Sequence, residues 1–93
     1  MSWHLRVRPE AELDLLLAAA WYQDQQAGLG ERFLEELFAL VDSLRNNALI
    51  YARVGARTRC AFARRFPYVV TYQLEESTVI VLSVMHARRQ PAR

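Results

Sequence analysis

The sequence contains no lysine, one cysteine, three glycines and three prolines. With Cys60 alone, neither an internal disulfide nor a multi-cysteine metal site can form, which fits a reducing compartment. So few glycines and prolines leave little material for disordered linkers. All basic side chains are therefore arginines, whose planar fork suits bidentate contacts with phosphates or carboxylates. Biased codon usage explains the missing lysine more simply, so the placement of the arginines is more informative than their number.

Long hydrophobic runs are also missing. The apolar run from residue 15 to 21 is too short to span a bilayer, and the N-terminus has no secretory pattern. We therefore expect a cytoplasmic protein with no membrane partner, no metal and no cofactor. The 93 residues, 53% of them apolar, predict a single domain over residues 1–93 with one modest core.

Charge divides the chain into two halves. Residues 1–52 carry four arginines against eight acids, a net charge of −4, whereas residues 53–93 carry eight arginines against two acids, a net charge of +6. Summed charge of one sign raises the local concentration of an oppositely charged ligand. The basic half is therefore expected to meet a partner rich in phosphates or carboxylates.

The first half of the chain predicts a strand and two helices. Apolar and polar residues alternate over 3–8, which indicates a half-buried strand. Pro9 fits the first position of a helix that ends at Gly28, and we expect its apolar residues Leu13, Leu16, Leu17 and Ala20 to face the core, with Trp21 and Tyr22. Gly28-Leu29-Gly30 predicts a tight reversal, and a second amphipathic helix, with Phe33 to Leu44 at helical spacing, ends at Asn46-Asn47.

The second half predicts three strands. From residue 57 the period is two, with Thr58, Cys60 and Phe62 expected on an apolar face and Arg57, Arg59, Ala61 and Arg65 on a basic one. A strand after Pro67 and a strand over 78–85, apolar on both faces and so central, complete the sheet. We expect Val69, Val79, Val81 and Met85 to share the outer face with the arginines, and residues 87–93 to form a loose basic tail.

The order strand, helix, helix, strand, strand, strand predicts an α+β fold. Two short helices cannot bury their apolar faces on each other alone, so the helical hairpin is expected to pack on one face of a mostly antiparallel four-stranded sheet. The other face, mixed apolar and basic, is a candidate surface for another chain.

The residues now described resemble a known family. They are Trp21-Tyr22, Gly28-Leu29-Gly30, Phe33, Arg59, Phe66-Pro67-Tyr68, Tyr72, His86, Arg88-Arg89 and Pro91, in that order. This pattern is similar to the RelE/ParE superfamily of bacterial toxins, in its ParE-like, plasmid-stabilisation branch, over residues 3–91. The resemblance implies a type II toxin with a cognate antitoxin, with which it forms a hetero-oligomer, and DNA gyrase as the target.

The resemblance also implies a choice of mechanism. A toxin that acts by binding would use Arg57, Arg59, Arg65, Arg88 and Arg89 against its target or antitoxin. RelE-like relatives instead cut mRNA on the ribosome, and here His86 as general acid or base with Arg59 would be the catalytic candidates. A degenerate, non-toxic binding module is a third alternative. The chain has neither tyrosine nor lysine after His86, unlike ribosome-dependent relatives, so we favour the binding toxin.

Two further groups of residues have structural interpretations. The aromatic residues Trp21, Tyr22, Phe66, Tyr68 and Tyr72 are expected in the core where the helices meet the sheet, rather than in a base-stacking platform. Cys60 alternates with the apolar face, so we expect a buried small side chain rather than a reactive thiol. For Arg59 a partner's carboxylate and an internal salt bridge to the acidic helices remain equal alternatives.

Overall fold

Seven elements follow one another along the chain. The computed structural model describes residues 2–89. They are β1 (His4–Val7), α1 (Pro9–Gln25), α2 (Leu29–Asn47), β2 (Thr58–Phe62), β3 (Tyr68–Glu75), β4 (Thr78–His86) and a 3-10 helix, η1 (Ala87–Arg89). Residues 90–93 of the expected basic tail lie outside the described part of the chain, whereas η1 is held by a hydrogen bond from Ala87 N–H to the Pro67 carbonyl.

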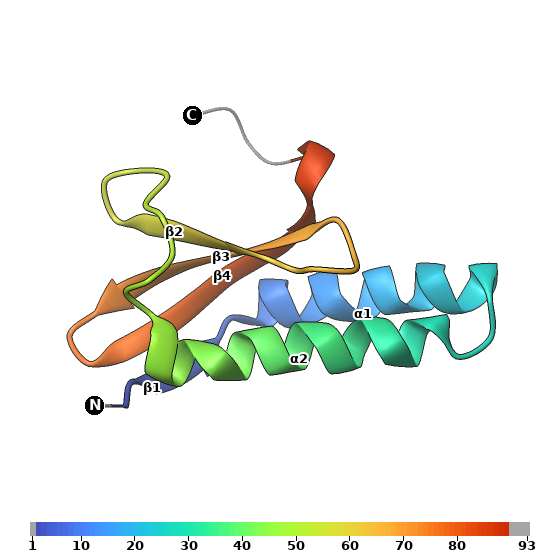
Figure 1. Ribbon diagram of the computed structural model, residues 1–93, viewed down its shortest axis with the longest axis horizontal. Helices are drawn as coiled ribbons and strands as arrows, with labels where there is room; N and C mark the ends of the chain where they lie inside the picture. The colour runs from blue at the N-terminus through green and yellow to red at the C-terminus, as the bar shows by residue number, and fades with distance from the viewer. Residues whose placement is uncertain (1, 90–93) are drawn as a thin grey trace.

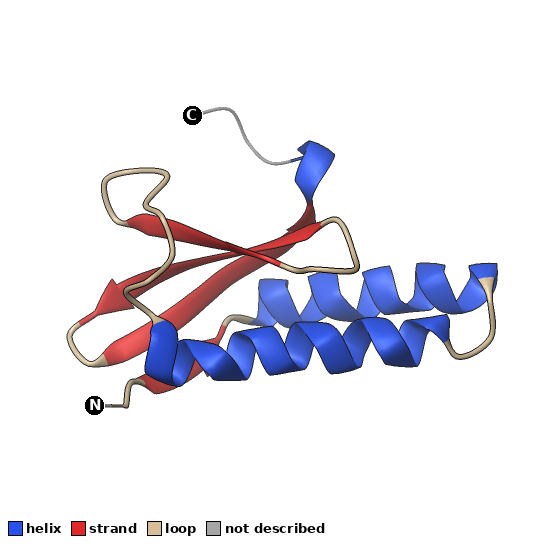
Figure 2. Ribbon diagram, in the orientation of Figure 1, coloured by secondary structure: helices blue, strands red, loops and turns tan. Residues whose placement is uncertain are grey.

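The four strands form one sheet in the order β1-β4-β3-β2. β1 runs parallel to β4, and β4, β3 and β2 are antiparallel neighbours. The two helices lie side by side, antiparallel, on one face of this sheet (Figures 1 and 2). The predicted α+β fold is therefore confirmed, including the central position of the apolar strand β4.

The core lies between the helix pair and the sheet. From the helices it includes Phe33, Leu37 and Leu44, and from the sheet Val70, Tyr72, Val79, Val81, Val84 and Ala61. Two expectations about the strands are therefore wrong. Val79 and Val81 belong to the core cluster with the helices rather than to the outer surface, and the β2 residue in that cluster is Ala61, whereas Phe62 is 55% exposed. On β2 the alternation of side chains places Cys60 and Phe62 on one face and the small Ala61 on the face beneath the helices, where little space is left for a larger side chain.

The turn between the helices explains the Gly-Leu-Gly sequence structurally. Gly28 has φ +88°, a left-handed conformation that strains other residues, and it directly precedes α2. A Cβ on Gly30 would stand 2.5 Å from the Ala19 carbonyl oxygen, so glycine allows the two helices to approach closely. The Gln23 Oε1 atom accepts hydrogen bonds from the N–H groups of both glycines and so satisfies the start of α2.

Helix α1 begins at Pro9 as predicted, but it faces the core with a different set of residues. The buried residues of α1 are Ala11, Leu15, Ala18 and Ala19. The leucines expected in the core are instead on the solvent side, together with Trp21, so these expectations are wrong. Small alanines let α1 lie close to α2 and β4, and the larger leucines occupy the side where nothing within the described residues covers them.

Candidate functional site

One side of α1 presents large apolar side chains to solvent. We call Leu13, Leu16, Leu17 and Trp21 the outer face of α1. Their exposed fractions lie between 55% and 62%, although they belong to the two middle turns of a helix whose opposite side is fully packed. A helix that is apolar on both sides is typical of burial on both sides. Such a contiguous exposed patch marks a surface for another macromolecule.

The outer face continues into a groove between α1 and the C-terminal half of β4. This α1–β4 groove has a volume of about 850 Å³. It is lined by Asp14, Leu17, Ala18, Trp21 and Tyr22 of α1, by Tyr68 of β3, by Val84, Met85 and His86 of β4, and by Arg88 of η1. Apolar walls with a few polar groups at defined places are typical of a binding site.

Aromatic rings pack against one another beside the groove. Tyr22 stacks on Phe33 with ring centroids 5.2 Å apart and meets Phe66 edge-on at 4.9 Å. Burial, followed by the nearby Tyr68 hydroxyl, raises the pKa of Tyr22 above its usual value. The expected aromatic core is therefore present, except that Trp21 lies at its rim and is 57% exposed.

His86 ends β4 at one end of the groove. Its Nδ1 atom accepts a hydrogen bond of 3.1 Å from the Arg88 N–H, and its ring lies edge-on to Tyr68 at 5.3 Å. A neutral imidazole whose Nδ1 accepts must carry its proton on Nε2. The nitrogen left for a ligand is therefore a donor, which suits binding and does not suit removal of a proton from a ribose hydroxyl.

Arg59 and Tyr72 lie side by side on β2 and β3 and hold the end of α2. Arg59 Nη1 donates to the carbonyls of Tyr51 (2.7 Å) and Leu49 (3.3 Å), while the Tyr72 hydroxyl donates to the Ala48 carbonyl at 2.7 Å. Burial raises the pKa of Tyr72 to about 12 despite the opposing charge of Arg59. Neither alternative expected for Arg59 accounts for these bonds, because its partners are backbone carbonyls and not carboxylates.

The remaining predicted arginines do not form one surface. Arg57 precedes β2, whereas Arg65 follows it and Arg88 follows β4, so Arg57 lies at the opposite end of the sheet from the other two. All three are exposed, and no hydrogen bond within residues 2–89 engages their guanidinium groups. The side chain of Arg89 lies outside the described part of the chain. The structure thus brings only Arg88 and His86 together, in the groove.

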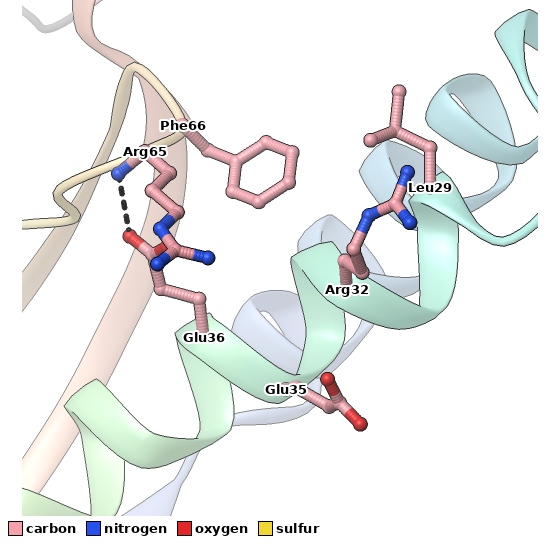
Figure 3. Close-up of a pocket in the computed structure, with 6 residues that line it drawn as sticks. All are labelled: Leu29, Arg32, Glu35, Glu36, Arg65 and Phe66. Carbon is pink, nitrogen blue, oxygen red and sulfur yellow. Dashed lines mark hydrogen bonds between the residues drawn. The ribbon is translucent and has the colours of Figure 1, made fainter.

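Within residues 2–89, the arginines of the basic half form no salt bridge with the acidic half. Within residues 2–89 the salt bridge is between Arg45 and Asp42, neighbours on α2. A second hollow of about 470 Å³, lined by Leu29, Arg32, Glu35, Glu36, Arg65 and Phe66, places acids and arginines on facing elements (Figure 3). There the Glu36 carboxylate accepts the N–H groups of Arg64 (2.6 Å) and Arg65 (2.9 Å), which fixes the β2–β3 turn on α2. We interpret this hollow as a structural contact.

Sequence reasoning missed two features of the site. Asp14, to which no role was assigned from the sequence, accepts a hydrogen bond of 3.0 Å from the Val84 N–H on β4. The outer face of α1 was also missed, although residues 11–22 carry apolar side chains around almost the whole helix, and that is the signal that could have revealed it.

Two further properties bear on function. Among the described residues no three or more histidine, cysteine or acidic side chains gather in a group that could hold a metal ion. No helix within residues 2–89 combines the length and the apolar character needed to cross a membrane. Cys60, as expected, is buried.

Solved structures of other proteins share this fold. The chain is similar in fold to a toxin–antitoxin structure described as the chromosomal ParDE system from P. aeruginosa, at 16% identity, covering 91% of this chain and 96% of that one, with a TM-score of 0.78. The RelBE2 complex from Mycobacterium tuberculosis matches at 22% identity, with 92% and 99% coverage and a TM-score of 0.68. A mutant of E. coli RelE in the free state matches at 20% identity, with 97% and 88% coverage and a TM-score of 0.54.

Comparison at the level of sequence shows the family of the chain. Comparison with curated protein sequences found no significant match. The profile described as the ParE toxin of the type II toxin–antitoxin system parDE matches residues 5–91. Because this match covers nearly the whole chain, the protein belongs to the ParE toxin family of type II toxin–antitoxin systems.

Proposed function

We propose that this ParE-family chain inhibits growth in the cytoplasm by binding a cellular target, DNA gyrase, and that a cognate antitoxin neutralises it by covering the same surface. The choice of gyrase rests on family membership. The observation that carries the choice of binding is the outer face of α1, which continues into the α1–β4 groove. A soluble protein leaves so large an apolar patch uncovered where a partner docks.

The chemistry of the groove supports binding rather than RNA cleavage. His86 presents a donor nitrogen to the groove because its Nδ1 atom accepts the Arg88 N–H. Asp14, the carboxylate of the groove, is already used by the Val84 N–H. Cleavage by attack of a 2′-hydroxyl needs a base within reach of that proton, and we take the hydrogen bonds already made by His86 and Asp14 as support for the binding toxin.

Arg88 gives the groove its charge. Its exposed side chain lies beside His86, and we propose that it contacts carboxylates of the target, with Arg65 and Arg89 near the same end of the sheet and Arg57 as a more distant contact. Arg59 is assigned a supporting role, because its guanidinium is bonded to the loop after α2. An antitoxin segment in the groove would cover Arg88, which explains neutralisation by simple occlusion.

The test separates the binding toxin from its alternatives. The chain is expressed from a tight promoter while plasmid supercoiling, the DNA damage response and mRNA integrity are followed, and the purified protein is added to a gyrase supercoiling assay. We expect growth arrest, DNA damage and inhibited supercoiling, with intact mRNA. Codon-dependent mRNA cuts without any effect on gyrase would establish the ribosome-dependent nuclease, and unchanged growth would establish the non-toxic module.

His86→Gln is the matched variant in both assays. Loss of a general base costs about 10²- to 10⁴-fold in rate, so a nuclease would lose its toxicity. A binding toxin should retain growth arrest in this variant, because glutamine keeps a side-chain amide that can donate into the groove.

A further inference from the structure

The β2–β3 turn connects helix α2 with the C-terminal helix η1. On one side of the turn, the Glu36 carboxylate of α2 accepts the N–H groups of Arg64 and Arg65, at 2.6 and 2.9 Å. On the other side, the Pro67 carbonyl accepts the N–H of Ala87, the first residue of η1, at 2.7 Å. Glu36 and Ala87, far apart in the sequence, are therefore connected through a single short turn.

The position of η1 depends on this turn. Besides the bond to Pro67, the Arg88 N–H donates to the Nδ1 atom of His86 at 3.1 Å. The His86 ring lies edge-on to the ring of Tyr68, the residue after Pro67, with centroids 5.3 Å apart. Both contacts lead to the start of β3, so a displacement of the turn displaces Arg88 as well.

Two anchors of different kinds hold the turn. Phe66 is 9% exposed, and its ring meets those of Tyr22 and Phe33 edge-on, at 4.9 and 5.2 Å. Contacts between rings tolerate small displacements, whereas hydrogen bonds are directional. Bonds from N–H groups to a carboxylate are also about twice as strong as those between neutral groups. Glu36 thus sets the orientation of the turn's backbone, which ring packing alone leaves free.

Helix α2 supplies both this acid and a matched control for it. Glu36 follows the buried Phe33 by three positions and directly precedes the buried Leu37, so it lies at the edge of the packed side of the helix. Glu35 lines the same hollow but projects away from the turn (Figure 3). Within residues 2–89 the Glu35 carboxylate takes part in no hydrogen bond or ion pair.

We propose that Glu36 is a positioning residue for Arg88. Its carboxylate fixes the β2–β3 turn, the turn fixes η1, and η1 presents Arg88 to the bound target. This inference rests on the proposed function in one respect, because that function makes Arg88 the charged contact of the toxin. An acid on α2 then sets the affinity of the toxin without touching the target.

Amide hydrogen exchange of the full-length chain tests the positioning. In Glu36→Ala we expect the Ala87 amide to exchange at least about fivefold faster, while the Cys60 amide in the middle of β2 changes by less than about twofold. Glu36→Gln keeps an oxygen that accepts N–H groups, and Glu35→Ala removes an equal charge from the same hollow. In both of these variants the Ala87 amide should stay within about twofold of the original rate.

Three results would overturn the inference. The first is an Ala87 amide that exchanges at the original rate in Glu36→Ala. The second is an equal acceleration at Cys60, because it would show that the whole sheet has loosened. The third is an acceleration in Glu35→Ala as large as in Glu36→Ala, because it would assign the effect to the lost charge and not to the hydrogen bonds.

Inhibition of gyrase supercoiling tests whether Glu36 acts through Arg88. Arg88→Ala and Glu36→Ala should each raise the half-inhibitory concentration at least about threefold. The double variant should exceed Arg88→Ala by less than about twofold, because a positioning residue then has nothing left to position. Effects that multiply in the double variant would contradict the inference. If the unchanged chain leaves gyrase active, the proposed function falls, and exchange at Ala87 alone decides the inference.

Discussion

At the scale of single residues, a buried tyrosine and a half-buried arginine hold the exit from α2. Tyr72 is fully buried, and its hydroxyl donates a hydrogen bond to the carbonyl of Ala48, a residue that is 1% exposed. Arg59, on the neighbouring strand, satisfies the next carbonyls of the loop. Carbonyls left unpaired at a buried helix end are costly, so we assign these two side chains a stabilising role in the fold.

Tyr72→Phe tests this interpretation through the dependence of stability on pH. The pKa of Tyr72 is raised to about 12, whereas a tyrosine in the unfolded chain titrates near about 10. The unfolded chain therefore releases its proton first, and stability holds below about pH 10 and falls between about pH 10 and 12. No lysine titrates in this range.

Urea unfolding from pH 8 to 11.5 is the measurement. Tyr72→Phe should cost about 1 to 2 kcal/mol at neutral pH, through the unpaired Ala48 carbonyl, and should flatten most of the alkaline fall. A smaller alkaline fall in stability should remain in this variant, because the pKa of Tyr22 is also raised. An alkaline fall of unchanged size in the variant would show that Tyr72 does not have the assigned role.

At the scale of elements, α1 is a helix with two apolar sides of different purpose. Leu15 is 4% exposed and packs in the core, whereas Leu17, two residues later, is 62% exposed on the outer face of α1. Core burial of a leucine stabilises the fold, while the exposed leucine adds little until a partner covers it. Stability and binding are therefore carried by different leucines of one helix.

The pair Leu15→Ala and Leu17→Ala measures that division. The first variant should lower the free energy of unfolding by about 2 to 4 kcal/mol because it leaves a cavity between α1 and the sheet. The second should change it by less than about 0.5 kcal/mol, as for a surface position. Denaturant unfolding with equal slopes for both variants is the check, and equal losses would mean that the outer face is part of the core.

For α1, the sequence predicted the helix but not which of its sides is buried. Periodicity located β1, both helices, the Gly28 reversal and the central strand β4, because each depends on short-range spacing. It chose the wrong side of α1, since residues 11–22 are apolar in nearly all directions and only the sheet decides which side is covered. On β2 it reversed the faces for a similar reason, because the small Ala61 is selected by the helices above it.

At the scale of the whole molecule, the arginines of the basic half are spread over the surface, whereas exposed apolar side chains gather along α1. The +6 half predicted a basic sheet face, yet its arginines are distributed among the two ends of the sheet and the loop after α2. Their positions along the chain could be predicted, but their grouping in space could not, since it depends on strand order. The groove beside β4 combines apolar residues with Arg88 of η1 in its lining.

The most direct test of this account compares two leucines of equal exposure. Leu17, on the outer face of α1, and Leu49, after α2, are both 62% exposed, so glutamate at either position should leave the fold intact. The affinity of the adjacent-gene antitoxin for each variant is measured by titration calorimetry. The account predicts that Leu17→Glu weakens binding by at least about tenfold and Leu49→Glu by less than about twofold. Equal affinities for Leu17→Glu and the unchanged chain would contradict it.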